Sequence, residues 1–204
     1  MAYLIILIPF ALLILLNLLP ARSRTPIAFY ATLVLLAGQV LLSPFELVRS
    51  ASFEAMLGFN LLLNNFSLIL IITSGIVALA SLLTAGAMIK EDGKRFNFIN
   101  LLLILLIAMN GLAMAKDIFT LYVFIEAAAV ATFILIALNK DKYAFEGILK
   151  YLILSVVASV LMLSAIGLLI MSSGSLLLAD IRGFIFPSGG TVFSQAAMRA
   201  ASVL

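Results

Sequence analysis

The chain has 204 residues, of which 65% are hydrophobic and only 10% are charged. Its mean hydropathy is +1.31, and a soluble domain needs far more charge to cover its surface, so the composition predicts an integral membrane protein. The net charge of +3 is small and scattered, which argues against a nucleic-acid partner. Histidine, cysteine and tryptophan are absent. The chain therefore lacks the residues that form the common zinc, haem and iron–sulfur ligand sets, and we expect no cofactor.

Apolar runs predict six complete transmembrane helices, because one crossing needs about 20 residues. Their ranges are 3–19, 27–43, 67–89, 97–115, 118–138 and 146–171. Basic residues follow the first run instead of preceding it, so we interpret it as a retained span and not as a signal peptide. The predicted fold class is an all-α polytopic membrane protein, with residues 1–204 forming one transmembrane domain.

Three shorter segments complete the prediction. We expect residues 53–57 to lie along the membrane interface, and residues 176–180 are too short to cross and should pack at the membrane surface. Residues 193–204 begin like a seventh helix but supply only about 12 positions. Either the product is short or the chain continues beyond Leu204, and we favour continuation.

Lysine and arginine counts in alternate connections predict the orientation. One side carries seven of them: Arg22, Arg24, Lys90, Lys94, Arg95, Lys140 and Lys142. The other side carries three: Arg49, Lys116 and Arg182. The positive-inside rule puts the richer side in the cytoplasm, so the N-terminus is predicted to lie outside.

Glu126 is the most informative residue, because it lies in the apolar run 118–137 with no other charge. It is roughly 13 Å from the start of its span at 1.5 Å per residue, close to mid-bilayer. An acid there costs a few kcal/mol and usually serves transport, by accepting and releasing a proton. The alternative is a structural acid hydrogen-bonded between helices. The three alanines after it suit either interpretation, since small residues let a neighbouring helix approach.

Lys150 is the second candidate. Counted from the turn near Asp141, it lies roughly 9 Å from Glu126 along the helix axis, beyond direct contact. One interpretation gives it a role with Glu126 through its long side chain and one water. The other is snorkelling of the ammonium group to the interface.

Other polar residues favour structural roles. Asp117 should cap the fifth helix, and Glu146 should act similarly at the sixth. The hydroxyls of Ser155, Ser159 and Ser164 either line a water path or bond to a carbonyl one turn back. Asn110 and Gly111 suggest close packing near Glu126.

Residues 116–126 read KDIFTLYVFIE, and residues 147–155 read GILKYLILS. Both stretches resemble the antiporter-like subunits shared by respiratory complex I, membrane-bound hydrogenases and Mrp-type sodium/proton antiporters, with the Mrp D-type and hydrogenase branch closest. The family pattern is an Asp-x-x-x-Leu-x-x-Phe-x-Glu helix followed by a helix that opens with a Lys-Tyr pair. The matching positions are Asp117, Leu121, Phe124, Glu126, Lys150 and Tyr151. The resemblance extends from about residue 60 to residue 204.

The sequence departs from the family pattern in three places. Many relatives have Asp-Gly-Leu-Ser where this chain has Asn-Asn-Phe-Ser at 64–67, and a tryptophan where Ile125 stands. Family members also have about fourteen spans in two inverted repeats. In the first repeat, a lysine in a broken helix pairs with the glutamate. The resemblance implies that residues 193–204 open that broken helix, before its lysine.

The resemblance implies a proton-translocating subunit of a multisubunit redox-driven or antiporter complex, in the cell (inner or plasma) membrane. Its partners would be other membrane subunits, the lipid bilayer, protons and, as an alternative ion, sodium. Glu126 would carry the proton, and Lys150 would be an intermediate site or a charge that tunes Glu126. We expect no catalytic chemistry in this chain itself. The alternatives are a half-length scaffold subunit without an ion pathway and an unrelated small-solute carrier, for which we find no recognisable substrate pocket.

Overall fold

The computed structural model describes residues 4–20, 24–46, 52–56, 59–138 and 142–185, and of residues 42–46, 52–56, 59, 60 and 143 it describes the backbone alone. In chain order the elements are α1 (Leu4–Leu18), α2 (Arg24–Glu46), β1 (Ser52–Met56), β2 (Phe59–Leu62), α3 (Asn65–Met88), α4 (Asp92–Met114), α5 (Ile118–Ala137), α6 (Lys142–Ser173) and α7 (Leu178–Ile185). The predicted helical membrane class is confirmed, with one short hairpin added to it.

Five helices, α2 to α6, are long and apolar enough to cross a bilayer. The sixth predicted span corresponds to α1, which has 15 residues and contains Pro9. At 1.5 Å per residue it is about 22 Å long, shorter than a full crossing. Six complete spans and an external N-terminus therefore stay predictions. The predicted start of a seventh helix at 193–204 lies outside the described residues, as do Arg22, Arg49 and Lys140.

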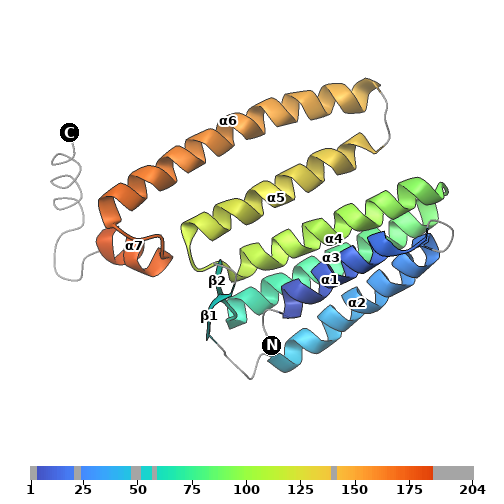
Figure 1. Ribbon diagram of the computed structural model, residues 1–204, viewed down its shortest axis with the longest axis horizontal. Helices are drawn as coiled ribbons and strands as arrows, with labels where there is room; N and C mark the ends of the chain where they lie inside the picture. The colour runs from blue at the N-terminus through green and yellow to red at the C-terminus, as the bar shows by residue number, and fades with distance from the viewer. Residues whose placement is uncertain (1–3, 21–23, 47–51, 57–58, 139–141, 186–204) are drawn as a thin grey trace.

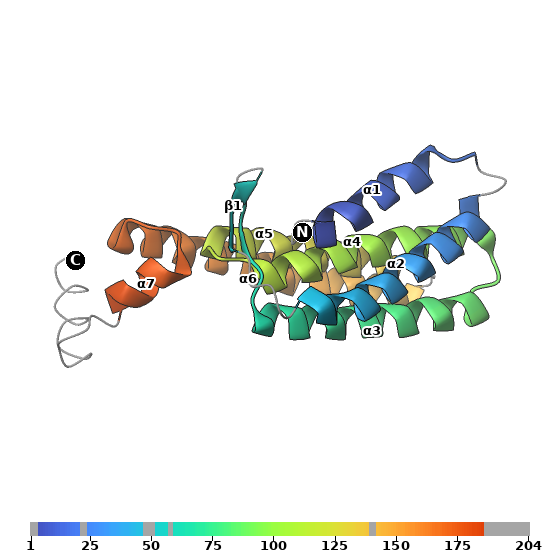
Figure 2. The same ribbon diagram turned by 90° about the horizontal axis from the view of Figure 1, so that it is seen from below.

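Helices α1 to α4 form a bundle, and α5 and α6 extend it on one side (Figure 1). The bundle has a continuous apolar core, because its helices direct large aliphatic side chains toward one another. The core residues are Leu16, Ala28, Leu36, Ala78, Leu82, Phe96, Ile99, Leu102, Leu103 and Leu106. Helix α5 packs on α4, and α6 packs mainly on α5 and α7, so α6 is the outermost helix on this side. Figure 2 shows α1 and α3 on opposite sides of α4.

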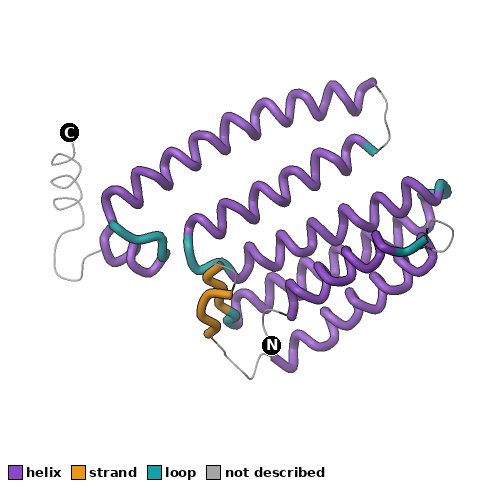
Figure 3. The backbone as a smooth tube through the Cα atoms, in the orientation of Figure 1, coloured by secondary structure: helices purple, strands orange, loops and turns teal. Residues whose placement is uncertain are grey.

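Short extended segments tie the chain together at the end where α4 meets α5 (Figure 3). The β1–β2 hairpin lies here, so residues 53–56 of the predicted interfacial segment form a strand. Leu61 pairs with Ala115, and Asp117 pairs with Leu177. The backbone N–H of Ile118 donates to the carbonyl of Leu176 at 3.1 Å. The α4–α5 and α6–α7 connections are therefore joined directly.

Basic residues lie at the opposite end of the bundle. The Arg24 guanidinium lies 4.3 Å from the centroid of the Phe96 ring. The Thr25 hydroxyl donates to the Asp92 carbonyl at 3.4 Å. The start of α2 and the α3–α4 connection therefore lie at the same end of the bundle. The orientation predicted from the lysine and arginine counts requires this. Which end faces the cytoplasm stays a prediction.

Candidate functional site

Glu126 lies on the face of α5 that meets α6. Two contacts define this face: the Tyr122 and Ser159 hydroxyl oxygens are 2.9 Å apart, and the Phe133 and Tyr151 rings meet edge to face at 5.0 Å. Positions 122, 126 and 133 follow the spacing of one helix face. The half-buried Glu126 side chain therefore projects into the α5–α6 interface, between the hydroxyl pair and the aromatic pair.

The opposite face of α5 packs closely on α4. The Phe124 ring covers Gly111, and a Cβ built on Gly111 would overlap the ring edge. Glycine is therefore needed for the two helices to approach at this level. This confirms the predicted close packing near Glu126 for Gly111. Asn110 is different, because its side chain bonds to α1, α2 and α3.

Helix α6 supplies hydroxyl groups level with Glu126. Interpolation between the two α5–α6 contacts puts Glu126 level with about residue 156 of α6. Ser155 and Ser159 are half-buried, whereas most of the surrounding positions on α6 are exposed. Ser155 lies on the same α6 face as Tyr151 and Ser159, because four residues separate each from the next. Ser155 therefore faces the region of Glu126.

Lys150 is not brought next to Glu126. Its ammonium group lies 2.6 Å from the Glu146 carboxylate on the same helix, and the two side chains are 73% and 56% exposed. Because Glu126 is level with about residue 156 of α6, Lys150 lies about 9 Å from Glu126 along the helix axis. This is close to the offset predicted from the sequence. Because α6 begins at Lys142, Glu146 lies inside the helix. The expectation that Glu146 caps α6 is therefore wrong.

Asp117 is the N-cap of α5, as predicted. Its carboxylate accepts hydrogen bonds from the Thr120 backbone N–H and hydroxyl, both at 2.7 Å. Asp117 is buried, and its backbone pairs with Leu177. The start of α5, nine positions before Glu126, is thus fixed by both a side-chain cap and a backbone bridge.

The serines of α6 divide into two groups. Ser164, Ser172 and Ser173 donate to carbonyls three or four residues back, the usual behaviour of a helical serine. Ser159 instead bonds to Tyr122, and Ser155 makes no hydrogen bond within the described part of the chain. Only Ser155 and Ser159 therefore keep the water-path interpretation.

A polar network that the sequence prediction missed joins the four helices of the bundle. The fully buried Asn110 side chain exchanges hydrogen bonds with Gln39 on α2, both at 3.2 Å. It accepts from the Ser74 hydroxyl at 3.1 Å and donates to the Ile5 carbonyl at 3.4 Å. The signal in the sequence was one amide in each of two apolar runs. Sequence alone does not show that the two amides meet.

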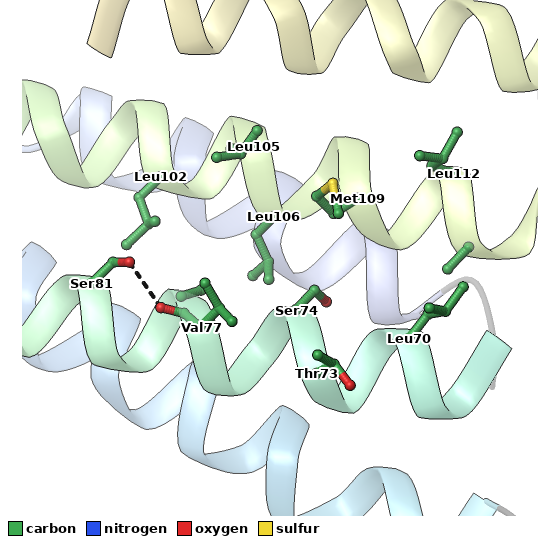
Figure 4. A pocket seen from close by; sticks show the side chains of 12 residues that line it. Leu70, Thr73, Ser74, Val77, Ser81, Leu102, Leu105, Leu106, Met109 and Leu112 are labelled. Atoms are coloured by element: carbon green, nitrogen blue, oxygen red, sulfur yellow. Dashed lines mark hydrogen bonds between the residues drawn. The ribbon is translucent and has the colours of Figure 1, made fainter. Parts of the chain in front are cut away.

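A groove of about 410 Å³ lies between α3 and α4 (Figure 4). Its lining is apolar apart from Thr73, Ser74 and Ser81, and no lining residue is charged. The Ser81 hydroxyl donates to the Val77 carbonyl at 2.8 Å, and the Thr73 hydroxyl donates to the Ile69 carbonyl. The groove therefore offers no group that binds or releases a proton at neutral pH, and the candidate site is the α5–α6 interface.

The fold and the site define a multi-pass helical membrane protein with a carboxylate midway along one span. The family described as NADH:quinone oxidoreductase/Mrp antiporter, transmembrane part, matches residues 115–204. The matched segment begins just before Asp117 and includes both Glu126 and Lys150. With the relatives below, this match confirms the resemblance found in the sequence to the antiporter-like membrane subunits.

Individual relatives are subunits of two kinds of complex. The chain is 29% identical over 148 residues to the D-type subunit of the Na(+)/H(+) antiporter of Alkalihalophilus pseudofirmus, a match that covers 72% of this chain and 30% of the relative. It is 30% identical over 196 residues to the N-type subunit of the NADH-quinone oxidoreductase of Dehalococcoides mccartyi, covering 93% and 39%. The fold matches a chain of the archaeal membrane-bound sulfane sulfur reductase with a TM-score of 0.78 and 23% identity, covering 88% and 39%. The chain thus spans less than half the length of each.

Proposed function

We propose that this chain translocates protons as part of an antiporter-like subunit in a multisubunit complex of the cell membrane. Glu126 is the group that binds and releases the proton. The observation that carries the proposal is the place of Glu126, half-buried in the α5–α6 interface beside hydroxyl groups. A carboxylate near mid-bilayer costs a few kcal/mol, so its persistence there favours a role in ion movement.

The Lys150–Glu146 ion pair is the second part of the proposed pathway. It lies about 9 Å from the level of Glu126 along the helix axis, toward the connection between α5 and α6. In the proposal Lys150 is an intermediate site, or a charge that changes the affinity of Glu126 for protons. Glu146 would hold the lysine ammonium while it is not engaged with another group.

The partners follow from the relatives and are part of the proposal. One relative belongs to a sodium/proton antiporter and another to a quinone oxidoreductase. We propose that the protein assembles with other membrane subunits, and that the energy for transport comes from a redox partner or from an opposing ion gradient. Proton is the proposed ion because a single carboxylate with neighbouring hydroxyls can exchange one. Sodium is the alternative ion.

The test is Glu126→Gln in the full-length protein, assembled in its complex in membrane vesicles. Glutamine keeps the side-chain size but cannot exchange a proton at neutral pH. We expect complex assembly to be normal and proton uptake to be abolished. Glu91→Gln is the matched control, because it removes an exposed carboxylate in the α3–α4 connection, outside the α5–α6 interface, and it should retain uptake. Uptake at the normal rate in Glu126→Gln would refute the proposal.

One observation favours the scaffold alternative. Within the described residues, Glu126 forms no ion pair, and the ion pairs found there are Lys94–Glu91 and Lys150–Glu146. A scaffold subunit would assemble and support the complex without carrying ions, so Glu126→Gln would leave uptake unchanged. The same vesicle measurement therefore separates the two functions.

A further inference from the structure

The α5–α6 interface differs on the two sides of Glu126. Toward the end where α4 joins α5, the half-buried Tyr122 lies one turn from Glu126 on the same face, and its hydroxyl contacts the Ser159 hydroxyl at 2.9 Å. Toward the α5–α6 connection, the Phe133 and Tyr151 rings meet edge to face at 5.0 Å. Glu126 therefore has hydroxyl groups on one side and an aromatic contact on the other.

The behaviour of the serines supports a special role for the hydroxyl side. A serine in a membrane helix usually bonds to a carbonyl of its own helix, as Ser164 does with Val160 at 2.7 Å. Ser159 bonds across to α5 instead. Ser155, one turn away and level with Glu126, makes no hydrogen bond in the part of the chain that the structure describes. Both hydroxyls can therefore bind water or pass on a proton.

The opposite side carries the Tyr151 hydroxyl, but Tyr151 is 44% exposed, and its hydroxyl makes no hydrogen bond among the described residues. The charged residues nearest the aromatic pair are Lys150 and Glu146, which are exposed and bonded to each other. Two rings in contact leave no room for a chain of water molecules between them. A proton that reaches Glu126 along the α5–α6 interface therefore has one approach through hydroxyl groups that bond to each other, the Tyr122–Ser159 pair.

We propose that Ser159, Tyr122 and Ser155 form a hydroxyl relay for Glu126, and that the Phe133–Tyr151 contact, in the state that the structure shows, closes the interface between Glu126 and Lys150. This inference rests on the proposed function and adds the route by which the proton arrives. Each hydroxyl oxygen accepts a proton from one neighbour and releases its own hydrogen to the next. Water completes the path between the Tyr122 hydroxyl and the Glu126 carboxylate, bound by these groups and by Ser155. One proton moves, and no atom of the relay is lost.

The relay is tested by removing single hydroxyl groups from the full-length protein in membrane vesicles. Tyr122→Phe and Ser159→Ala should each slow proton uptake roughly tenfold or more, since positioned proton transfer contributes at least that much to rates. Ser159→Thr keeps a hydroxyl and should restore most of the rate. Ser164→Ala is the matched control on the same helix, because the Ser164 hydroxyl donates to the Val160 carbonyl of its own helix. It should leave uptake unchanged.

The aromatic closure is tested by Phe133→Ala, which removes one ring of the contact. We expect a raised passive proton leak across the vesicle membrane, measured without an energy source. A leak equal to that of the unmodified protein would overturn this part of the inference.

Glu126→Gln is measured in parallel, so that the two proposals fail separately. Normal uptake in Glu126→Gln would refute the proposed function and the relay together. Abolished uptake in Glu126→Gln, with normal uptake in Tyr122→Phe and Ser159→Ala, would refute the relay alone. Equal slowing in Ser159→Ala and Ser159→Thr would show that Ser159 acts through packing, and it would also refute the relay. Complex assembly is quantified for each variant by the amount of co-purified partner subunits.

Discussion

The bundle α1–α4 and the α5–α6 pair are both built from apolar helices but have very different interiors. Half of the residues in the apolar stretch of α4 are buried within the chain, compared with 11% of those in α5 and 6% of those in α6. In the bundle, Asn110, Gln39 and Ser74 bond to one another. In the α5–α6 interface, neither Glu126 nor Ser155 has a hydrogen-bond partner among the described residues.

Under the proposed function, this difference separates polar residues that hold the helices together from polar residues that exchange protons. A polar group in a membrane helix is costly unless it is bonded, so the amide network of the bundle is explained by the packing that it stabilises. An acid and a serine without such bonds contribute little to packing. Their presence beside the Tyr122–Ser159 pair is better explained by an exchange of protons. Three substitutions test this contrast, and they are taken in order of the effect that we expect on stability.

Asn110→Leu should have the largest effect on stability, because it removes the four hydrogen bonds that the buried Asn110 side chain makes to Gln39, Ser74 and the Ile5 carbonyl. Gln39 and Ser74 keep their bonds to the Ile71 carbonyl. Each buried polar atom that loses its partner costs about 1–3 kcal/mol, so the melting temperature of the purified complex should fall clearly. Asn100→Leu is the control on the same helix, since Asn100 bonds to Asn17 in an exposed pair at 3.3 Å. Equal melting temperatures for the two variants would contradict the assigned role of the network.

Gly111→Ala should destabilise the protein by roughly 1 kcal/mol or more, because the added Cβ meets the Phe124 ring and forces it to move. Gly167→Ala provides the control, since a Cβ on this α6 glycine would meet nothing within 4 Å. Alanine is the better helix former, so the control should be neutral or slightly stabilising. Thermal unfolding of both variants measures the difference. A stabilising Gly111→Ala would show that α4 and α5 are not in close contact here.

Lys150→Gln should have the smallest effect on stability. The Lys150–Glu146 pair is mostly exposed, and exposed pairs four residues apart on a helix contribute about 0.3–0.5 kcal/mol. A change in proton uptake that exceeds this small stability change would support the role of Lys150 as an intermediate site. If uptake and stability are both unchanged, the lysine only anchors the helix at the membrane surface.

Much of the fold could be predicted from the sequence because apolar runs and their charged ends have local causes. The boundaries of α3 to α5 lie within a few residues of the predicted runs, and Asp117 caps α5 as its position before the helix suggested. The β1–β2 hairpin was missed because its strands are only five and four residues long. Short strands carry too little periodicity to be recognised.

The candidate site was only partly predictable, because the contacts between its helices have causes that are not local in the sequence. Glu126 stood out because a lone acid in an apolar run is rare. Its neighbours depend on helix rotation and on the register between α5 and α6, which no single helix encodes. The same limit explains Asn110, which was expected near Glu126 but bonds into the bundle, on a different face of α4 from the one that contacts Phe124.

The most direct test of the central claim is infrared difference spectroscopy of the full-length protein during ion movement. If Glu126 binds and releases a proton there, the unmodified protein will show a carboxyl C=O band that appears and disappears with turnover. We predict that this band is missing in Glu126→Gln and unchanged in Glu91→Gln, which removes an exposed carboxylate outside the α5–α6 interface. A band that persists in Glu126→Gln would contradict the claim that this carboxyl group carries the proton.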